Sequence, residues 1–223
     1  MANQKLASSA SVIKSDAAYG CFYSAKLDST TDTKLYDREE GTLVTSFVSA
    51  IKTYVAGSGD TDAETVTANL KYVSDISDEG ITTSISEDNT SFNNMDGDVV
   101  LRSRTSRDET VNLSMIDTTA EALKAYYGET NVSVSDGVMT VHHNGNDDTE
   151  RIGVFLLALS DGRRMCRVIP HYTISEHGDE TLLNSELWAH EITLGTLADA
   201  NGDTIIDYIA ESADTNTSVV SEG

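Results

Sequence analysis

The segment at residues 81–115, ITTSISEDNTSFNNMDGDVVLRSRTSRDETVNLSM, predicts the fold class. Apolar or β-branched residues alternate with polar ones on both sides of a turn-forming stretch at 93–97; they are Ile81, Thr83 and Ile85 before it and Val99, Leu101, Val111, Leu113 and Met115 after it. A period of two is typical of β-strands that bury one face. The segment therefore predicts strands joined by a turn, and with them a mainly β fold.

Further strands are predicted on both sides of this segment, in apolar-rich runs at 19–27, 138–142, 152–159, 163–174, 187–194 and 204–209. The run IGVFLLAL at 152–159 is apolar on both faces, so it is expected to be covered on both sides. Asp161 and Gly162 form a two-residue hairpin signal. The last two runs are expected to pair as a final hairpin across the turn sequence ADANGD.

One short helix is predicted directly after residue 117. Thr118 fits an N-cap, and Glu121 three residues later completes a capping box. Leu123 and Tyr127 share one face, and Gly128 stands where a glycine ends a helix. About ten residues are too few for a stable isolated helix, so this one is expected to pack on the sheet.

A single domain is expected at residues 17–211, because no proline-rich linker divides the chain. An N-terminal arm at 1–16 and a polar C-terminal tail at 212–223 flank it. An acidic insertion loop is expected at about 28–65. Within it, residues 43–55 fit either a short helix, from the spacing of their apolar residues, or a folded-over strand, from their Val and Thr content.

Acidity is the strongest feature of the composition. The chain has 37 acidic and 15 basic residues among 223, a formal net charge of −22 and a pI near 4.3. Binding of a phosphate backbone over the surface needs clustered Lys and Arg, so general nucleic-acid binding is excluded. Two accounts of the acidity stay open: adaptation to a salt-rich, halophilic host, and an acidic path that a polyanion passes without adhering.

The N-terminal residues 1–14 are polar and lack the apolar region of a secretory signal, and no apolar run is long enough to span a bilayer. The protein is therefore expected to fold in a cytoplasm and to have no membrane segment. Cys21 and Cys166 lie far apart in the sequence and are expected to be two free thiols in a core.

No residue pattern predicts catalysis or a cofactor. His142 and His143 would point to opposite faces of a strand. Asp199, Asn201 and Asp203 resemble the start of a calcium loop, but the required glycine and bidentate glutamate are missing, so an Asn-Gly turn is the simpler interpretation.

Four arginines are expected to form ion pairs within or between subunits: Arg102, Arg104, Arg163 and Arg164.

Two parts of the chain resemble the major tail tube protein of long-tailed bacterial or archaeal viruses. Residues 70–128 carry the resemblance in Tyr72, Val73, Ser74, Glu79, Gly80, Ile81, then Gly97, Asp98, Val99, then Thr118, Glu121, Leu123, Lys124 and Gly128. Residues 187–209, LWAHEITLGTLADANGDTIIDYI, carry it in a strand that includes Trp188, a turn with Gly202, and a last strand. The chain departs from the family in having Ala198 at a common proline position and Met95 near the place of a usual aromatic.

The resemblance implies an antiparallel β-sandwich or half-barrel with one flanking short helix. It implies a virion tail subunit, assembled in the host cytoplasm, that forms stacked homohexameric rings. DNA would pass the lumen without specific binding. The other implied partners are the tape-measure protein, the tail terminator and the distal tail or baseplate proteins. Open sheet edges would be closed by neighbouring copies.

Three alternatives stay open. Another viral ring protein (neck, tail terminator or distal tail) would differ in copy number. A carbohydrate- or receptor-binding sandwich would need an exposed aromatic platform, whereas Trp188 is expected inside a strand. An enzyme is the least supported, because no catalytic constellation is present.

Overall fold

The computed structural model describes residues 19–28, 34–57, 63–144, 149–159, 162–180, 182 and 188–211. The predicted N-terminal arm at 1–16 and C-terminal tail at 212–223 lie outside these residues. The elements in chain order are β1 (Tyr19–Lys26), β2 (Tyr36–Asp37), β3 (Thr42–Leu43), α1 (Thr45–Val55), α2 (Ala63–Thr67), β4 (Lys71–Asn93), β5 (Val99–Met115), α3 (Ala120–Tyr127), β6 (Val132–Ser135), β7 (Val138–Val141), β8 (Arg151–Ala158), β9 (Arg164–His177), β10 (His190–Thr196) and β11 (Ile206–Ile209). No helix of the described segments is long and apolar enough to cross a membrane.

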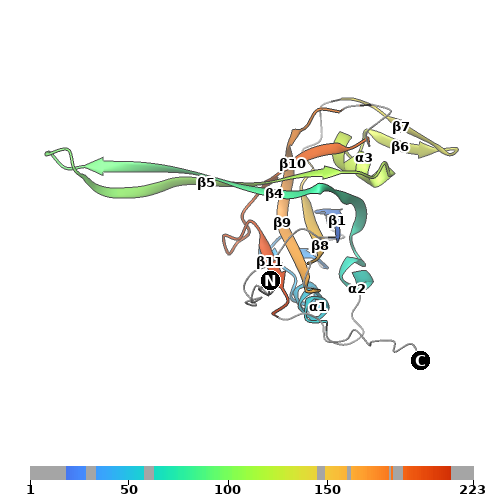
Figure 1. Cartoon of the computed structure of the whole chain (residues 1–223), viewed down its shortest axis with the longest axis horizontal. Helices are drawn as coiled ribbons and strands as arrows, with labels where there is room; N and C mark the ends of the chain where they lie inside the picture. Colours follow the sequence, from blue (N-terminus) through green and yellow to red (C-terminus); the bar gives the residue numbers. More distant parts are fainter. Residues whose placement is uncertain are drawn as a thin grey trace, which may run out of the picture.

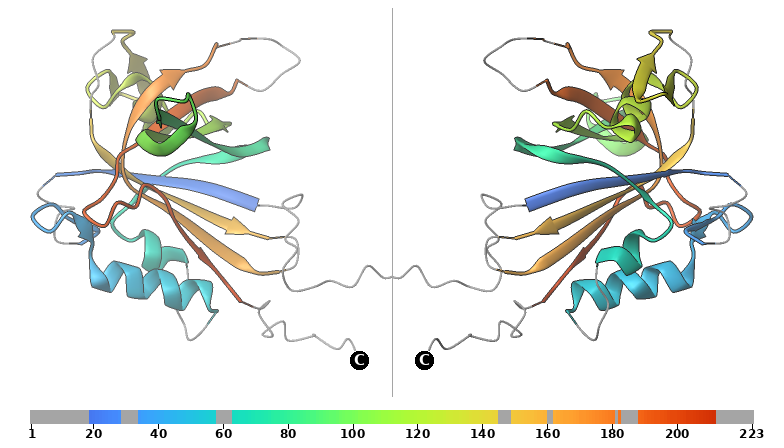
Figure 2. Two further views of the ribbon diagram at one scale, coloured as in Figure 1. Left: turned by 90° about the vertical axis from the view of Figure 1, so that its left-hand side faces the viewer. Right: turned by 90° about the vertical axis from the view of Figure 1, so that its right-hand side faces the viewer.

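The main sheet confirms the predicted antiparallel, mainly β fold. Its seven strands follow the order β10-β5-β4-β1-β8-β9-β11, and β10 also pairs with β9. That extra pairing joins β10, β5, β4, β1, β8 and β9 into a closed cycle of strands, called the barrel below. Figure 2 shows the strands curving around a common interior. Closing the cycle removes most of the open edges that the sequence analysis had assigned to neighbouring copies.

Strand β8 is covered on both faces, as predicted. Phe155 is fully buried with Phe22 in the core between the strands, where the two rings stack at 4.6 Å. Val154 and Leu156 point the other way, into a second core beneath α1. Two buried faces explain why this run lacks the alternation of a surface strand.

Two helices lie in the region that was expected to be an acidic loop at 28–65, so that expectation was wrong for residues 45–55 and 63–65. The ambiguous stretch at 43–55 forms α1, whose Phe47, Ile51 and Val55 repeat every four residues and are buried against the sheet. Helix α2 follows and buries Val66 in the same core. A helix forms here instead of a strand because the apolar residues of one helix face pack against the sheet.

Helix α3 forms where predicted but begins one residue later. Its N-cap is Thr119, whose hydroxyl accepts a hydrogen bond from the Ala122 amide at 3.1 Å. The capping box of Thr118 with Glu121 is therefore wrong, because the Glu121 carboxylate instead pairs with Lys71 and Lys124. The helix ends at Gly128, as expected.

The final hairpin prediction was also wrong. Strands β10 and β11 do not pair with each other in the described structure; each pairs with a different part of β9. The 14 residues of β9 offer an edge long enough for both. The turn sequence between them redirects the chain along that edge.

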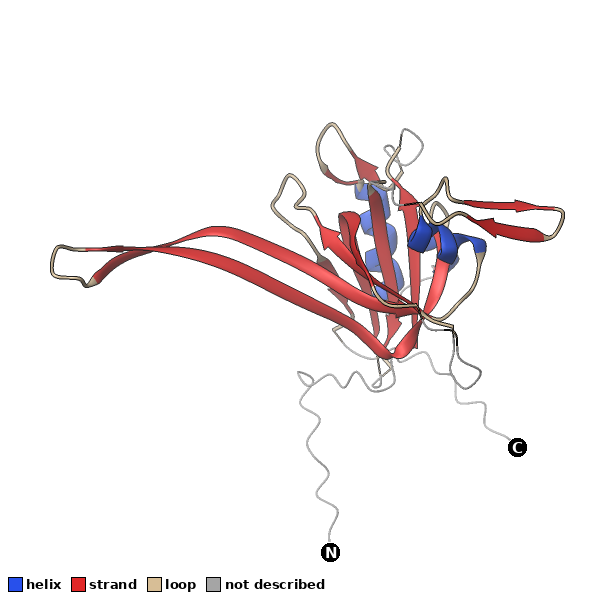
Figure 3. Ribbon diagram, turned by 90° about the horizontal axis from the view of Figure 1, so that it is seen from above, coloured by secondary structure: helices blue, strands red, loops and turns tan. Residues whose placement is uncertain are grey.

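Strands β4 and β5 continue far beyond the barrel as a long hairpin, called the arm below (Figure 1). Every residue from Ser84 to Thr105 is exposed. The sequence correctly predicts strands and a turn here. Its prediction that one face is buried was wrong for this stretch, because Ile85 and Leu101 are 55 % and 57 % exposed. Strands β6 and β7 form a separate short hairpin that projects at the opposite end of the molecule in Figures 1 and 3.

Candidate assembly surfaces

The arm has two chemically different faces, because antiparallel neighbours in register share a side of the sheet. One face carries an ion-pair cluster: Glu87 contacts Arg104 at 2.9 Å and Arg107 at 3.6 Å, and Arg107 contacts Glu109 at 3.4 Å. The predicted arginine ion pairs are thus confirmed for Arg104, within one subunit. The two pairs of Glu87 cross from β4 to β5, whereas the pair of Arg107 with the buried Glu109 lies within β5.

Arg163 and Arg164 form other contacts within the subunit. Arg163 donates to the carbonyl of Ala210 at 3.4 Å. Arg164 donates to the carbonyl of Tyr54 at 3.1 Å and lies over the Tyr54 ring, with the guanidinium carbon 5.0 Å from the ring centroid.

The other face of the arm ends in an apolar tip. Phe92 and Leu101 are direct cross-strand partners and are 52 % and 57 % exposed. Val100 and the turn residue Met95 add further exposed apolar surface. The turn itself is tied by the Asn94 side chain, which accepts from the Asp98 amide at 2.8 Å. A well-ordered turn therefore presents apolar groups to solvent.

The short hairpin presents a second apolar face. Val134 pairs with Met139 across the strands, and Val132 pairs with Val141 on the same face. Val132 is buried where α3 packs against β6, whereas Val134 and Met139 are 58 % and 41 % exposed. The apolar face thus runs out from under α3 into solvent.

These two hairpins hold most of the exposed apolar surface. Among the described residues, nine of the thirteen exposed large apolar side chains lie on them: Ile85, Phe92, Met95, Val99, Val100 and Leu101 on the arm, and Val134, Val138 and Met139 on the short hairpin. Concentrated apolar surface of this kind marks interaction sites. The sequence analysis missed this feature, although a phenylalanine and a methionine inside the polar stretch around the turn were a visible signal.

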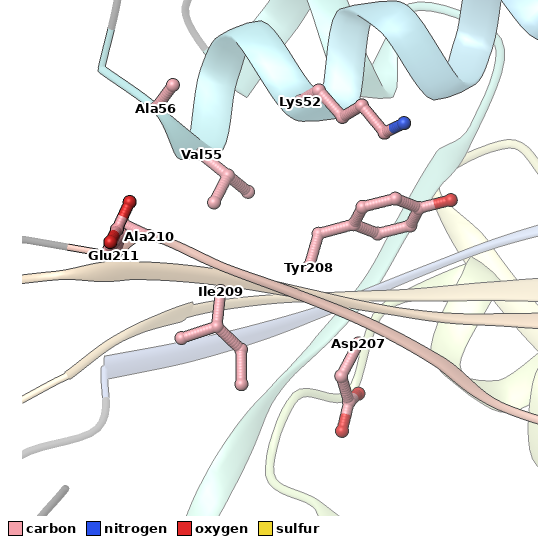
Figure 4. A pocket seen from close by; sticks show the side chains of 8 residues that line it. All are labelled: Lys52, Val55, Ala56, Asp207, Tyr208, Ile209, Ala210 and Glu211. Carbon is pink, nitrogen blue, oxygen red and sulfur yellow. The ribbon is translucent and has the colours of Figure 1, made fainter. Parts of the chain in front are cut away.

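A groove of about 350 Å³ lies between the end of α1 and the edge strand β11 (Figure 4). Lys52 and Val55 approach from the helix, and Tyr208 lies on the same side of the strand, while Asp207 and Ile209 point to the opposite side. Asp207 is held by Arg167 through two hydrogen bonds of 2.7 and 2.8 Å. The groove therefore consists of a sheet edge and a helix end, and of its two carboxylates, Asp207 and Glu211, the first is already paired with Arg167.

A charge network fastens α3 to the barrel. Glu121 binds Lys71 of β4 at 3.2 Å and Lys124 at 3.1 Å, Lys124 reaches Glu129 at 3.4 Å, and Glu129 binds Arg151 of β8 at 3.2 Å. Burial raises the pKa of the Glu121 carboxyl, but the hydrogen bonds from Lys124 and Lys71 outweigh it and leave that pKa below its ordinary value. The Lys71–Glu121 and Arg151–Glu129 pairs thus link strands β4 and β8 to α3 and the residues that follow it.

His190 is fully buried beneath a cluster of aromatic rings. The ring centroids of Tyr126 and Trp188 lie 4.9 and 5.0 Å from that of His190. Neither ring nitrogen of His190 has a hydrogen-bond partner in the described structure. Burial lowers the pKa of His190, while the nearby Glu180 carboxylate opposes that shift.

Trp188 lies just before β10 and not inside the strand, so its predicted position was wrong. Its indole N–H donates to Glu180 at 2.6 Å, and this hydrogen bond holds the ring against that of His190.

Neither cysteine forms a disulfide; Cys166 is buried in a core, as predicted, whereas Cys21 is only partly buried. Cys21 donates to the carboxylate of Asp75 at 3.2 Å. Burial raises the pKa of the Cys166 thiol to about 12.

The calcium-like sequence forms a turn. The Asp199 carboxylate accepts hydrogen bonds from the amides of Asn201 and Asp203 at 2.8 and 2.9 Å. Its oxygens therefore close the turn that contains Gly202. The described residues contain no group of three His, Cys, Asp or Glu side chains arranged to hold a metal ion.

The residues that carry the tail-tube resemblance do not meet at one place. Gly97, Asp98 and Val99 lie in or beside the arm turn, where Gly97 has a φ of 88° that favours glycine. Gly80 lies in β4, inside an irregular stretch between Ile76 and Ile81. These residues shape turns and bends and do not form a pocket.

Tyr72, Glu121 and Leu123 lie together near α3. Tyr72 donates to the carboxylate of Asp117 and packs edge-on against Tyr23 at 5.6 Å. Burial, followed by that hydrogen bond, raises the pKa of Tyr72. Leu123 is buried, so this group positions the helix on the barrel.

Comparison with known proteins gives one extensive match. Residues 17–220 match the family model described as phage tail tube protein. Among solved structures, the chain is similar to an anti-feeding prophage tube terminating cap, with 12 % identity, a TM-score of 0.36, and 59 % of this chain and 79 % of that chain covered. It is also similar to the sheath/tube terminator of the PVC extracellular contractile injection system in its extended state, with 11 % identity, a TM-score of 0.36, and 60 % and 86 % covered. No curated protein sequence is similar enough to count as a match. Because the family model spans most of the sequence, the chain belongs to the phage tail tube protein family.

Proposed function

We propose that this protein is the structural subunit of a viral tail tube, assembling as stacked hexameric rings around a lumen that conducts the genome. The observation that carries the proposal is the arm: a long ordered hairpin with an apolar tip, exposed in a subunit whose barrel is otherwise closed on itself. A hairpin of this length with unburied apolar residues is explained by contact with another molecule. Family membership supports a copy of the same chain as that molecule.

The acidity supports the second half of the proposal. With −22 net charge, the surface repels DNA over most of its area. A lumen lined with such a surface would let DNA and the tape-measure protein pass without adhering. The tail terminator and the distal tail proteins would bind the two ends of the stack. The same charge suits a halophilic host, because dense salt screens repulsion between copies.

Negative-stain electron microscopy of the purified full chain tests this proposal. The protein should be concentrated across a salt series from about 0.1 M to about 1 M, where the screening length falls from about 10 Å to about 3 Å. Hollow rings or tubes with sixfold symmetry are the expected result. A protein that stays monomeric at every salt concentration would contradict the proposal. In virions, hundreds of copies are expected, whereas a dozen or fewer would assign the chain to a neck, terminator or distal-tail ring.

A further inference from the structure

The two apolar hairpins differ from each other and project from opposite ends of the molecule (Figures 1 and 3). We propose that the arm tip of one copy packs on the apolar face of the short β6–β7 hairpin of a second copy. This inference rests on the proposed function, in that it takes a second copy as the partner, and it names the two surfaces that meet.

The short hairpin is suited to receive an apolar partner on one face. Its inner pair, Val132 and Val141, continues the packing under α3, and its outer pair, Val134 and Met139, extends the same face into solvent. The rung formed by Ser133 and Thr140 points to the opposite face. An occupant of the outer apolar pair therefore extends an existing core instead of covering an isolated patch.

The arm tip has the matching pattern. Its Phe92–Leu101 pair is also two strands wide, and its neighbouring rung on the same face, Thr90 with Ser103, is polar. The apolar part of the tip is thus about as wide as the apolar part of the short hairpin. Two cross-strand pairs of this kind can interlock in one layer of side chains.

Their positions favour contact between different patches on different copies. A contact of the arm with itself would close a dimer and leave the short hairpin exposed. A head-to-tail contact covers both patches on every copy and repeats, giving a ring or a continuous stack. The head-to-tail arrangement is therefore the one that the proposed rings and stack require.

Charge and area set the conditions of this contact. Asp96 and Asp98 lie in the arm turn, and Asp136 lies in the turn of the short hairpin, so side-by-side packing of the faces is favoured over tip-to-tip contact. Salt should strengthen the association by screening these carboxylates. Even full burial of all nine exposed apolar side chains, which include Ile85 and Val138 on the other faces of the hairpins, would remove only on the order of 900 Å² from water, below the ~1,200 Å² of a stable pairwise complex. A single contact is therefore weak and gains strength by repetition.

Two complementary variants isolate one contact. Variant one carries Phe92→Asp and Leu101→Asp, which removes the arm tip and keeps the short hairpin. Variant two carries Val134→Asp and Met139→Asp, which removes the short hairpin face and keeps the arm. All four side chains are exposed, so both variants should fold, as circular dichroism checks. The matched control carries Ser133→Asp and Thr140→Asp, which adds the same charge to the other face of the short hairpin.

In about 1 M salt, a mixture of the two variants should form a heterodimer by sedimentation velocity, while each variant alone should form none. The short hairpin of the control should bind the arm of variant two with unchanged affinity. The unaltered arm of the control should bind the short hairpin of variant one at least tenfold more tightly than the altered arm of variant one binds the short hairpin of another copy of variant one. A control as defective as variant two would overturn the proposal, and so would the absence of a heterodimer together with the absence of the disulfide described next.

A disulfide trap covers a contact too weak for sedimentation. One chain carries Cys21→Ser with Leu101→Cys, and a second carries Cys21→Ser with Val134→Cys. Oxidation of the mixture should give a dimer on a non-reducing gel, and Ser133→Cys in place of Val134→Cys should reduce its yield at least tenfold. Wild-type tubes without a heterodimer and without the disulfide would overturn this inference and leave the proposed function standing. If the two variants form the heterodimer but the wild-type chain never forms rings, the proposed function is overturned and this inference stands.

Discussion

Replacing two consecutive residues of β8, one at a time, tests whether a single subunit covers this strand on both faces. Phe155→Ala empties space in the core between the strands, where Phe155 is fully buried and stacks on Phe22. Leu156→Ala empties space beneath α1, where Leu156 is 6 % exposed. Substitutions of this kind lower the free energy of unfolding by about 3–5 kcal/mol for Phe and about 2–5 kcal/mol for Leu, because a cavity is left behind. Both losses are expected here.

The assay is urea unfolding of the dilute, monomeric protein at fixed salt, followed by circular dichroism and by the fluorescence of Trp188. The control is Leu101→Ala on the arm, whose side chain is 57 % exposed and whose loss should change the free energy of unfolding by less than about 0.5 kcal/mol. The reasoning is refuted if either core substitution costs less than about 1 kcal/mol. That result would mean that one face of β8 is covered by a neighbouring copy and not by its own chain.

Three further predictions concern the helix cap, the buried histidine and an ion pair. Thr119→Ala should cost about 1 kcal/mol of unfolding free energy, whereas Thr118→Ala should be close to neutral, and equal effects would contradict the observed cap. Because burial lowers the pKa of His190, the unfolded chain binds a proton first, so stability should fall as pH drops below about 6.5. His190→Gln should flatten this pH dependence of the urea midpoint, and an unchanged slope would refute the assignment. Arg167→Met should cost about 1 kcal/mol by removing the two hydrogen bonds to Asp207 and the one to Thr83, with a smaller loss in high salt; a loss independent of salt would point to packing and the Thr83 bond instead.

Much of the fold follows from local patterns. The alternating segment predicts β4, β5 and their turn, and the doubly apolar run predicts the buried strand β8. The helix after residue 117 is also visible, but its first residue is not. Thr118 and Thr119 are equally good caps by composition, and Glu121 favours the first only if no other partner is near. Glu121 has two such partners: Lys124, three residues later and visible in the local sequence, and Lys71, 50 residues earlier, which no local signal shows.

Coverage of the strands could not be predicted in the same way. A period of two indicates that one face differs from the other, and it does not say which molecule covers the apolar face. Ile81 and Ile85 belong to one alternating run, yet the barrel covers Ile81 in part and leaves Ile85 exposed. The candidate assembly surfaces are therefore a property of where the strands leave the barrel, which depends on the pairing of the whole sheet.

The final two strands show the same limit. Both were recognised as strands, and the turn between them was recognised as a turn. Their predicted partner was wrong because sequence neighbours usually pair, whereas here each of them pairs with a different part of the long strand β9.

The continuity of β4 and β5 has a mechanical consequence. Each strand is a single element from the barrel wall to the arm, with register shifts at 76–81, 88–89 and 92–93, so no loop separates the part that would touch a neighbour from the part that forms the wall. The ladder of hydrogen bonds between them makes the arm a stiff lever, and a displacement of its tip tilts the wall from which it grows. In a stack of such subunits, the tilt of one wall would be imposed on the next, and a disturbance at one end could travel along the whole assembly.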